Sequence, residues 1–171
     1  MGELDEWKHC PRCGSDRLAV DKGMAECPEC GFRAYASAKP TASAACLDEE
    51  GRVLLSLRAE EPFAGKWDLP GGFLDEEESP LACLRRELRE EGGVEIEPLD
   101  FLGVWTDRYG GDGSAQTTLN LYWTARIVEG RLEPADDVAE FRWFAPDDVD
   151  EDELAFEHTR EVLSLLRQKH A

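Results

Sequence analysis

Two spacings organise the apolar positions of this chain, one typical of strands and one typical of helices. The segments Thr41–Leu47 and Arg52–Leu57 flank a turn and are predicted as strands. Thr117–Val128 is rich in β-branched and aromatic residues, which predicts a central strand. Looser alternation over Val94–Trp105 and clearer alternation over Val138–Phe144 predict further strands.

A helix is predicted between Ser79 and Gly92. Ser79 is a favourable N-cap, and Pro80 suits the first helical position because its missing N–H would be unpaired there. Gly92 and Gly93 end the helix, since glycine accepts the left-handed conformation after the last turn. Three leucines at helical spacing are expected to face the core: Leu81, Leu84 and Leu88.

A closing helix is predicted over Glu157–Lys169. Its apolar face is expected to comprise Val162, Leu165 and Leu166. His158 stands at the helix start and is expected to be a surface or capping histidine. Strands mixed with two helices agree with an α/β fold but do not prove one.

Three carboxylates share one stripe of the first helix: Glu87, Glu90 and Glu91. Glu87 and Glu91 are like charges one turn apart, and all three lie near the helix C-terminus, where the macrodipole favours cations. One interpretation is a solvated face with ion pairs, such as that of Arg86 with Glu90. The other is a site for a hard divalent cation, which prefers oxygen ligands.

The stretch from Gly72 to Val94 resembles the box of the Nudix hydrolases, G-x5-E-x7-R-E-U-x-E-E-x-G-U with U apolar. Every defined position matches, in the order Gly72, Glu78, Arg86, Glu87, Leu88, Glu90, Glu91, Gly93 and Val94. The resemblance implies that Glu87, Glu90 and Glu91 bind Mg²⁺ or Mn²⁺. It also implies that Glu78 and Arg86 brace the loop and the helix, with Glu78 as an additional candidate metal ligand.

The same resemblance implies an α/β/α sandwich with a mixed sheet, which we place at residues 37–171. The implied reaction is hydrolysis of the phosphoanhydride bond in a nucleoside diphosphate linked to another group. A bound cation would neutralise the diphosphate and activate the attacking water. One of the box glutamates, or a carboxylate outside the box such as Glu140, would accept the proton.

Two C-x-x-C-G motifs lie near the N-terminus, at Cys10–Gly14 and Cys27–Gly31. Each pair can supply two thiolates to a tetrahedral Zn²⁺, and a closed four-thiolate shell indicates a structural metal. We therefore predict a zinc ribbon over residues 1–36, with the segment from Ala34 to Lys39 as a linker. A disulfide framework is the competing interpretation, and it suits an oxidising compartment. The remaining cysteines, Cys46 and Cys83, are expected to be small buried hydrophobic residues.

A zinc ribbon before a Nudix domain resembles the NADH pyrophosphatase subgroup, yet the Ser-Gln-Pro-Trp-type signature of that subgroup is absent after the box. ADP-ribose or a related compound is the favoured substrate, with NADH, an NAD cap on RNA and diadenosine polyphosphates as alternatives. A non-catalytic nucleotide sensor or a zinc-ribbon binding module is the second class of function. The intact box carboxylates favour the enzyme.

Substrate contacts are expected outside the box carboxylates. The candidates are Arg58, Lys66, Trp67 and Tyr109. Core packing or a solvated side chain is the alternative for Lys66 and Trp67. Tyr109 belongs to the glycine-rich segment Asp107–Gln116, which is expected to be a hairpin connection.

The net charge of −19 at 171 residues argues against a broad surface for nucleic acid or anionic membrane. No stretch has the apolar length of a membrane span, and the N-terminal residues lack the apolar region of a signal peptide. We therefore expect a cytoplasmic protein. Three roles for the ribbon stay open: packing beside the active site, supporting a homodimer, and contacting a nucleic acid. Its mixed charge makes the last the weakest.

Overall fold

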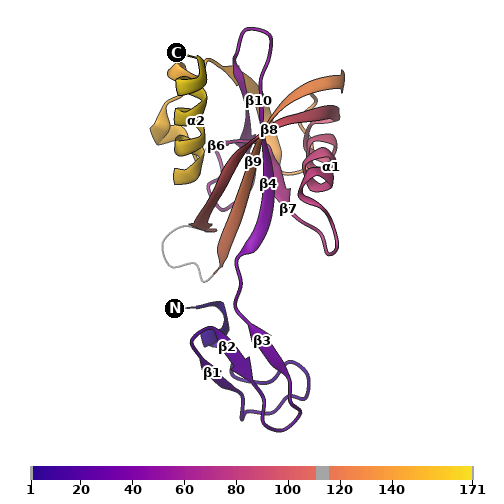
Figure 1. The fold of residues 1–171 in the computed structure, drawn as a ribbon, viewed down its shortest axis with the longest axis vertical. Helices are drawn as coiled ribbons and strands as arrows, with labels where there is room; N and C mark the ends of the chain where they lie inside the picture. Colours follow the sequence, from indigo (N-terminus) through magenta and orange to yellow (C-terminus); the bar gives the residue numbers. More distant parts are fainter. Residues whose placement is uncertain (1, 111–115, 171) are drawn as a thin grey trace. The chain divides into compact units, whose positions relative to one another are not determined.

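The computed structural model describes residues 2–110 and 116–170, so residues 111–115 of the expected hairpin connection lie outside the described residues. Contacts divide the chain into two compact units. One comprises residues 1–38 and 108–117 and is called the ribbon unit below. The other comprises residues 39–107 and 118–171 and is called the sandwich unit. Both are shown in Figure 1.

The ribbon unit is built on a small antiparallel sheet. A short 3₁₀ helix, η1 (Glu3–Glu6), precedes three strands in the order β1-β2-β3: β1 (Ala19–Asp21), β2 (Met24–Glu26) and β3 (Arg33–Tyr35). The predicted linker is wrong in extent, because β3 and the next strand occupy both of its ends. Only residues 36–38 connect the two strands.

The sandwich unit contains a mixed four-stranded sheet in the order β7-β4-β9-β8. Its strands are β4 (Lys39–Cys46), β7 (Gly71–Phe73), β8 (Val94–Arg108) and β9 (Thr117–Gly130). β4 runs parallel to β9 and antiparallel to β7. β9 therefore lies inside the sheet, as its composition predicted.

A second sheet of three antiparallel strands has the order β10-β5-β6. It comprises β5 (Val53–Arg58), β6 (Trp67–Asp68) and β10 (Val138–Phe144). β4 and β5 were both predicted as strands flanking one turn. They belong to different sheets, and Leu47, just after β4, forms an antiparallel bridge with Val53 of β5.

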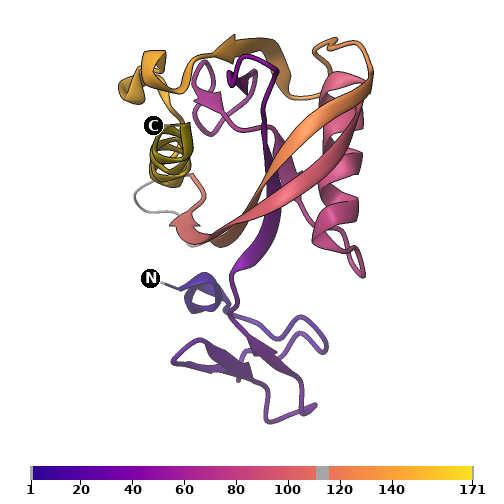
Figure 2. The same ribbon diagram turned by 45° about the horizontal axis from the view of Figure 1, so that its top comes forward.

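Helices α1 (Pro80–Gly92) and α2 (Glu157–His170) cover opposite sides of the sheets, as Figures 1 and 2 show. Two hydrophobic clusters fill the two layers. The alternation of strand side chains decides the layer, because Ala44 and Leu54 join the α1 cluster while their neighbours Ala45 and Leu55 join the α2 cluster. The result is an α/β/α sandwich with a mixed sheet. Two short 3₁₀ helices, η2 (Pro146–Asp148) and η3 (Glu151–Glu153), precede α2.

The core face of α1 differs from the prediction at one position. Leu84 and Leu88 are fully buried, but Leu81 is 38% exposed, and Cys83 is buried instead. Leu81 lies in the first turn of the helix. Cys46 and Cys83 are buried as expected, and burial raises the pKa of each thiol to about 12.

In α2, Val162 and Leu166 face the core as predicted. Leu163 is also fully buried, whereas Leu165 is only partly buried, so the apolar stripe is rotated by part of a turn from the predicted one. None of the described helices combines the length and apolar character needed to cross a membrane.

Candidate active site

The capping of α1 matches its sequence signals. The Ser79 hydroxyl accepts a hydrogen bond from the Ala82 N–H at 3.3 Å, and Pro80 occupies the first turn. Gly93 adopts a left-handed conformation with φ of 66°, and its N–H bonds to the carbonyls of Arg89 and Leu88. The caps set where the helix begins and ends, and therefore which glutamates stand beside β7.

The glycines before the helix allow close approach of backbone and carboxylate. A side chain on Gly71 would overlap the backbone of Ala42 and Ser43 on the neighbouring strand. A side chain on Gly72 would overlap the carboxylate of Glu87. β7 can therefore lie against both β4 and α1 only because these two positions carry no side chain.

Glu91 is a buried carboxylate at the last turn of α1, with 6% of its surface exposed. Its Oε2 accepts a hydrogen bond from the Gly71 N–H at 3.2 Å. Burial raises the pKa of Glu91 well above its usual value, and the charges of Glu87 and Asp137 raise it further. The ionised form of Glu91 is therefore costly unless a cation joins it.

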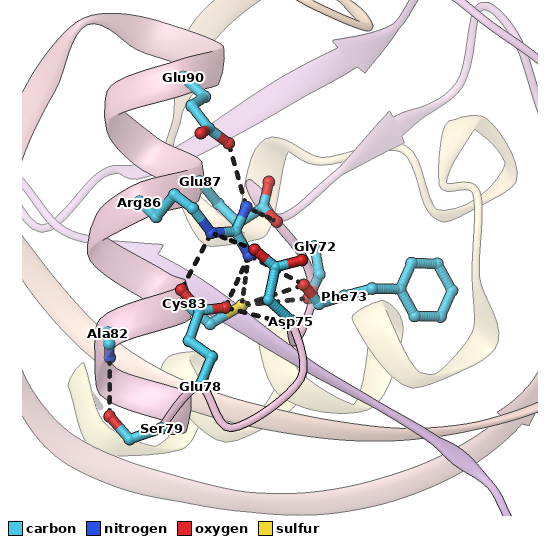
Figure 3. A network of polar contacts seen from close by, with 10 residues as sticks. All are labelled: Gly72, Phe73, Asp75, Glu78, Ser79, Ala82, Cys83, Arg86, Glu87 and Glu90. Carbon is cyan, nitrogen blue, oxygen red and sulfur yellow. Dashed lines mark hydrogen bonds and ion pairs between the residues drawn. The ribbon is translucent and has the colours of Figure 1, made fainter.

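Arg86 lies at the centre of an ionic network, shown in Figure 3. Its Nη1 donates to Glu87 Oε1 at 2.7 Å and to Glu90 Oε2 at 3.0 Å. Its Nε and Nη2 donate to the two oxygens of Glu78 at 2.9 and 2.8 Å. Nη2 also donates to the Phe73 carbonyl at 3.0 Å. One guanidinium thus joins α1, the loop before it and the end of β7.

The carboxylates around Arg86 differ in their electrostatics. The hydrogen bonds from Arg86 lower the pKa of Glu78 to about 2. Burial raises the pKa of Glu87, although the Arg86 hydrogen bond opposes that effect. The Glu90 side chain is 51% exposed. The site therefore presents one buried, one partly buried and one exposed carboxylate along a single helix face.

This donor set suits a hard divalent cation. All the ligands offered are carboxylate oxygens, and Glu91 is buried beside like charges with a backbone N–H as its donor. In the described residues, the three glutamates do not bring their oxygens into one compact group. Arg86 Nη1 bonds to both Glu87 and Glu90, whereas Glu91 Oε2 bonds to the Gly71 N–H. Glu87 Oε2 and Glu90 Oε1 stay outside those two bonds.

A second potential metal site lies in the ribbon unit. The sulfur atoms of Cys10, Cys13, Cys27 and Cys30 all lie within 4.8 Å of one another. The turns place them, since the Gly14 N–H bonds to the Cys10 carbonyl and the Gly31 N–H bonds to the Cys27 carbonyl. Four convergent cysteines of this spacing could hold a metal ion.

The predicted substrate-contact residues have diverse environments. Arg58 Nε donates to the Pro62 carbonyl at 2.8 Å, and Lys66 Nζ donates to the Asp152 carbonyl at 2.7 Å. Trp67 is a core residue with 6% exposure. Tyr109 belongs to the ribbon unit, whereas the box lies in the sandwich unit. Glu140, the candidate outside base, pairs with Arg142.

The prediction for His158 is wrong. His158 is 6% exposed, and its Nδ1 lies 2.9 Å from Oδ2 of Asp107. The adjacent Thr159 is fully buried and donates from Oγ1 to Asp68 Oδ1 at 2.8 Å. His158 lies 51 positions from Asp107, and Thr159 lies 91 positions from Asp68, so no local sequence pattern predicts these contacts.

Comparisons with known proteins agree with this geometry. The family model described as NUDIX domain matches residues 38–166. Among curated proteins, an NAD-capped RNA hydrolase NudC of Pseudomonas aeruginosa is 30% identical over 144 residues, which are 82% of this chain and 48% of that protein. An ADP-ribose pyrophosphatase of Methanocaldococcus jannaschii is 27% identical over 126 residues, or 72% of this chain and 71% of that protein.

The fold also matches a solved structure, the crystal structure of a NUDIX hydrolase from Nitrosomonas europaea. The TM-score is 0.77 at 25% identity, with 96% of this chain and 93% of that chain covered. The chain spans about half the length of the NudC relatives it matches.

Proposed function

The chain belongs to the NUDIX domain family, and on that premise we propose that it hydrolyses the phosphoanhydride bond of a nucleoside diphosphate linked to another group. An ADP-ribose-like substrate is favoured. Glu87, Glu90 and Glu91 are the proposed ligands of Mg²⁺ or Mn²⁺, and Cys10, Cys13, Cys27 and Cys30 are the proposed ligands of a structural Zn²⁺.

The observation that carries the proposal is Glu91. A carboxylate with 6% exposure at a helix C-terminus faces burial, a macrodipole of the wrong sign and the charges of Glu87 and Asp137. A solvated ion-paired face would place such a carboxylate in water or against a basic side chain. Burial without such compensation is typical of a group that binds a cation.

When bound, a divalent cation supplies charge neutralisation for a diphosphate and lowers the pKa of the attacking water. The chain's own residues position the proposed ligands. The Gly71 N–H orients Glu91, and Arg86 positions Glu87 while its bidentate pair with Glu78 holds the loop before α1. The Glu90 side chain is half exposed, so it can reach a ligand from the solvent side.

The similarity to an ADP-ribose pyrophosphatase supports the substrate class, because that match covers about seven-tenths of both proteins. The similarity to NudC proteins leaves about half of their length unmatched. An ADP-ribose-like substrate therefore has the more complete support.

The test is a panel of substrates with Mg²⁺ or Mn²⁺: ADP-ribose, NADH, diadenosine polyphosphates, nucleotide sugars, CoA and nucleoside triphosphates, with products separated by chromatography. We expect one preferred nucleoside diphosphate derivative. Glu91→Gln should lower turnover by about 100-fold or more, since it removes a charged ligand.

Glu95→Gln is the matched control, because Glu95 is an exposed carboxylate paired with Arg89 outside the site. It should leave turnover unchanged. Full activity in Glu91→Gln would contradict the metal site, and an inactive panel with metal binding intact would favour a nucleotide sensor.

A second candidate substrate is the NAD cap of RNA. The similarity to NudC proteins favours it, because that match covers 82% of this chain. Incubation with NAD-capped RNA and with free ADP-ribose at equal concentration separates the two. Faster decapping would reverse our preference.

Two further proposals concern the whole protein. A cytoplasmic location and a homodimer stay predictions from the sequence and the resemblance. Sedimentation of the purified protein gives its mass in solution, and a monomer at micromolar concentration would contradict the homodimer.

A further inference from the structure

A polar contact connects the C-terminal helix to the segment that enters the box. Thr159 on α2 is fully buried, and its Oγ1 donates to Asp68 Oδ1 at 2.8 Å. The same oxygen accepts the Leu69 N–H at 2.8 Å. Asp68 therefore receives one donor from α2 and one from its own strand end.

The segment that follows Asp68 is short and tightly held. The Leu69 side chain is buried in the α2 cluster, and the Pro70 carbonyl accepts the Ala44 N–H at 2.9 Å. The next residue is Gly71, whose N–H donates to Glu91. Asp68 therefore stands three positions before Gly71, the donor to the buried carboxylate.

Other contacts hold the same two segments together. The Ala155 N–H bonds to the Trp67 carbonyl at 2.9 Å, and Lys66 Nζ bonds to the Asp152 carbonyl. Ser56 Oγ donates to the Asp68 carbonyl at 3.3 Å. Lys66, whose contact with substrate stays a prediction, thus also bonds to the segment before α2.

We propose that Asp68 and Thr159 are positioning residues of the box: the Thr159–Asp68 hydrogen bond holds the Gly71 N–H where it orients Glu91 for the cation. This inference rests on the proposed metal site. Neither residue belongs to the box motif, and they are 91 positions apart in the chain.

A purely structural role is the alternative, because a hydroxyl–carboxylate hydrogen bond stabilises a fold wherever it lies. The two roles differ in what a mutation changes. Loss of stability alone leaves the cation affinity of the folded protein unchanged. Loss of positioning weakens cation binding in protein that is still folded.

The test compares Thr159→Val with Thr124→Val in the full, zinc-loaded chain. Thr124 is 5% exposed, and its Oγ1 bonds to the backbone N–H and carbonyl of Asp100, away from the box. Both substitutions remove one buried, hydrogen-bonded hydroxyl. Calorimetric titration with Mn²⁺ is performed below the melting temperature of each variant, and Glu91→Gln defines the signal due to the box.

We expect Thr159→Val to weaken Mn²⁺ binding about tenfold and to lower kcat more than it changes KM. Thr159→Ser should restore both, because it keeps the donor. Thr124→Val should bind Mn²⁺ as the wild type does. If Thr159→Val fails to fold, Thr159→Ser and Thr159→Ala decide the matter: Ser should bind Mn²⁺ normally and Ala weakly.

Wild-type Mn²⁺ affinity in folded Thr159→Val or Thr159→Ala would overturn the positioning role while leaving the proposed function intact. If Glu91→Gln binds Mn²⁺ as the wild type does, the proposed metal site is overturned, and the positioning role with it.

Discussion

In the ribbon unit two of the candidate metal ligands are themselves part of the small buried core, whereas in the sandwich unit the candidate ligands lie beside a core built from other residues. In residues 2–38 the buried apolar residues are Leu4, Cys10, Ala25 and Cys27, and two of them are candidate ligands. The sandwich unit buries two separate clusters, and its carboxylates lie at the edge of one of them. We therefore expect the ribbon to need its metal in order to fold, and the sandwich to fold on its own apolar core.

The largest expected effect is the loss of the ribbon on removal of zinc. Structural zinc sites supply on the order of 10 kcal/mol, more than so small a core can replace. Trp7 is the only tryptophan of the ribbon segment, so a nitrogen–proton NMR spectrum should show its indole signal collapse on chelation while the other four persist. An unchanged Trp7 signal in protein shown to be zinc-free would contradict the expectation that the ribbon needs its metal to fold.

Next comes truncation of the sandwich core. Leu84→Ala should cost about 2–5 kcal/mol of unfolding free energy, because it opens a cavity at a fully buried site. Leu81→Ala on the same helix should cost less than about 0.5 kcal/mol, because Leu81 is 38% exposed. Urea unfolding measures both, and equal losses would show that the helix buries a different face.

A smaller loss is expected when the ion pair behind the box is broken. Glu78→Gln should cost about 1–2 kcal/mol, since it removes a bidentate, partly solvated partner of Arg86. The folded pKa of Glu78 is lowered to about 2, below the unfolded value of about 4.3. Its stabilisation is therefore present above about pH 4.3 and is lost as the pH falls towards 2.

Acid titration of unfolding for wild type and Glu78→Gln measures this effect. The two curves should converge as the pH falls to about 2. A constant gap across that range would mean that the pair contributes through packing alone.

The smallest effect has the opposite sign. Glu91→Gln should raise the stability of the metal-free protein, by less than about 2 kcal/mol, because it removes a buried charge. The folded pKa of Glu91 is raised, so its contribution is fully present below the unfolded value and is lost as the pH rises through the folded value.

The advantage of Glu91→Gln should therefore grow with pH, and added Mg²⁺ should reverse it. Thermal unfolding with and without Mg²⁺ measures both. A metal-free variant less stable than wild type at neutral pH would mean that the Gly71 hydrogen bond outweighs the burial cost.

Local signals predicted the elements well. Ser79 and Gly93 cap α1 as expected, because capping depends on residues within one turn. The predicted burial of Leu81 was wrong, because helical spacing defines a stripe but does not say which part of that stripe is covered. The box residues were found because their spacing alone is distinctive.

Pairs that are distant in the chain escaped prediction. His158 with Asp107 and Thr159 with Asp68 depend on how α2 packs, which no short pattern contains. Trp67 was considered both as a substrate contact and as core, and its burial supports the core. The role of Lys66 depends on the carbonyl of a residue 86 positions away.

The parallel pairing of β4 with β9 has a consequence during synthesis of the chain. Partners such as Thr41 and Asn120 are separated by 79 residues. At about 5–20 residues per second, a ribosome needs roughly 4 to 16 seconds to make that interval. β4 leaves the ribosome well before β9, its parallel neighbour, and the intervening segment includes the whole box. The edge of β4 that pairs with β9 must therefore stay unpaired during this interval, when chaperones can protect it.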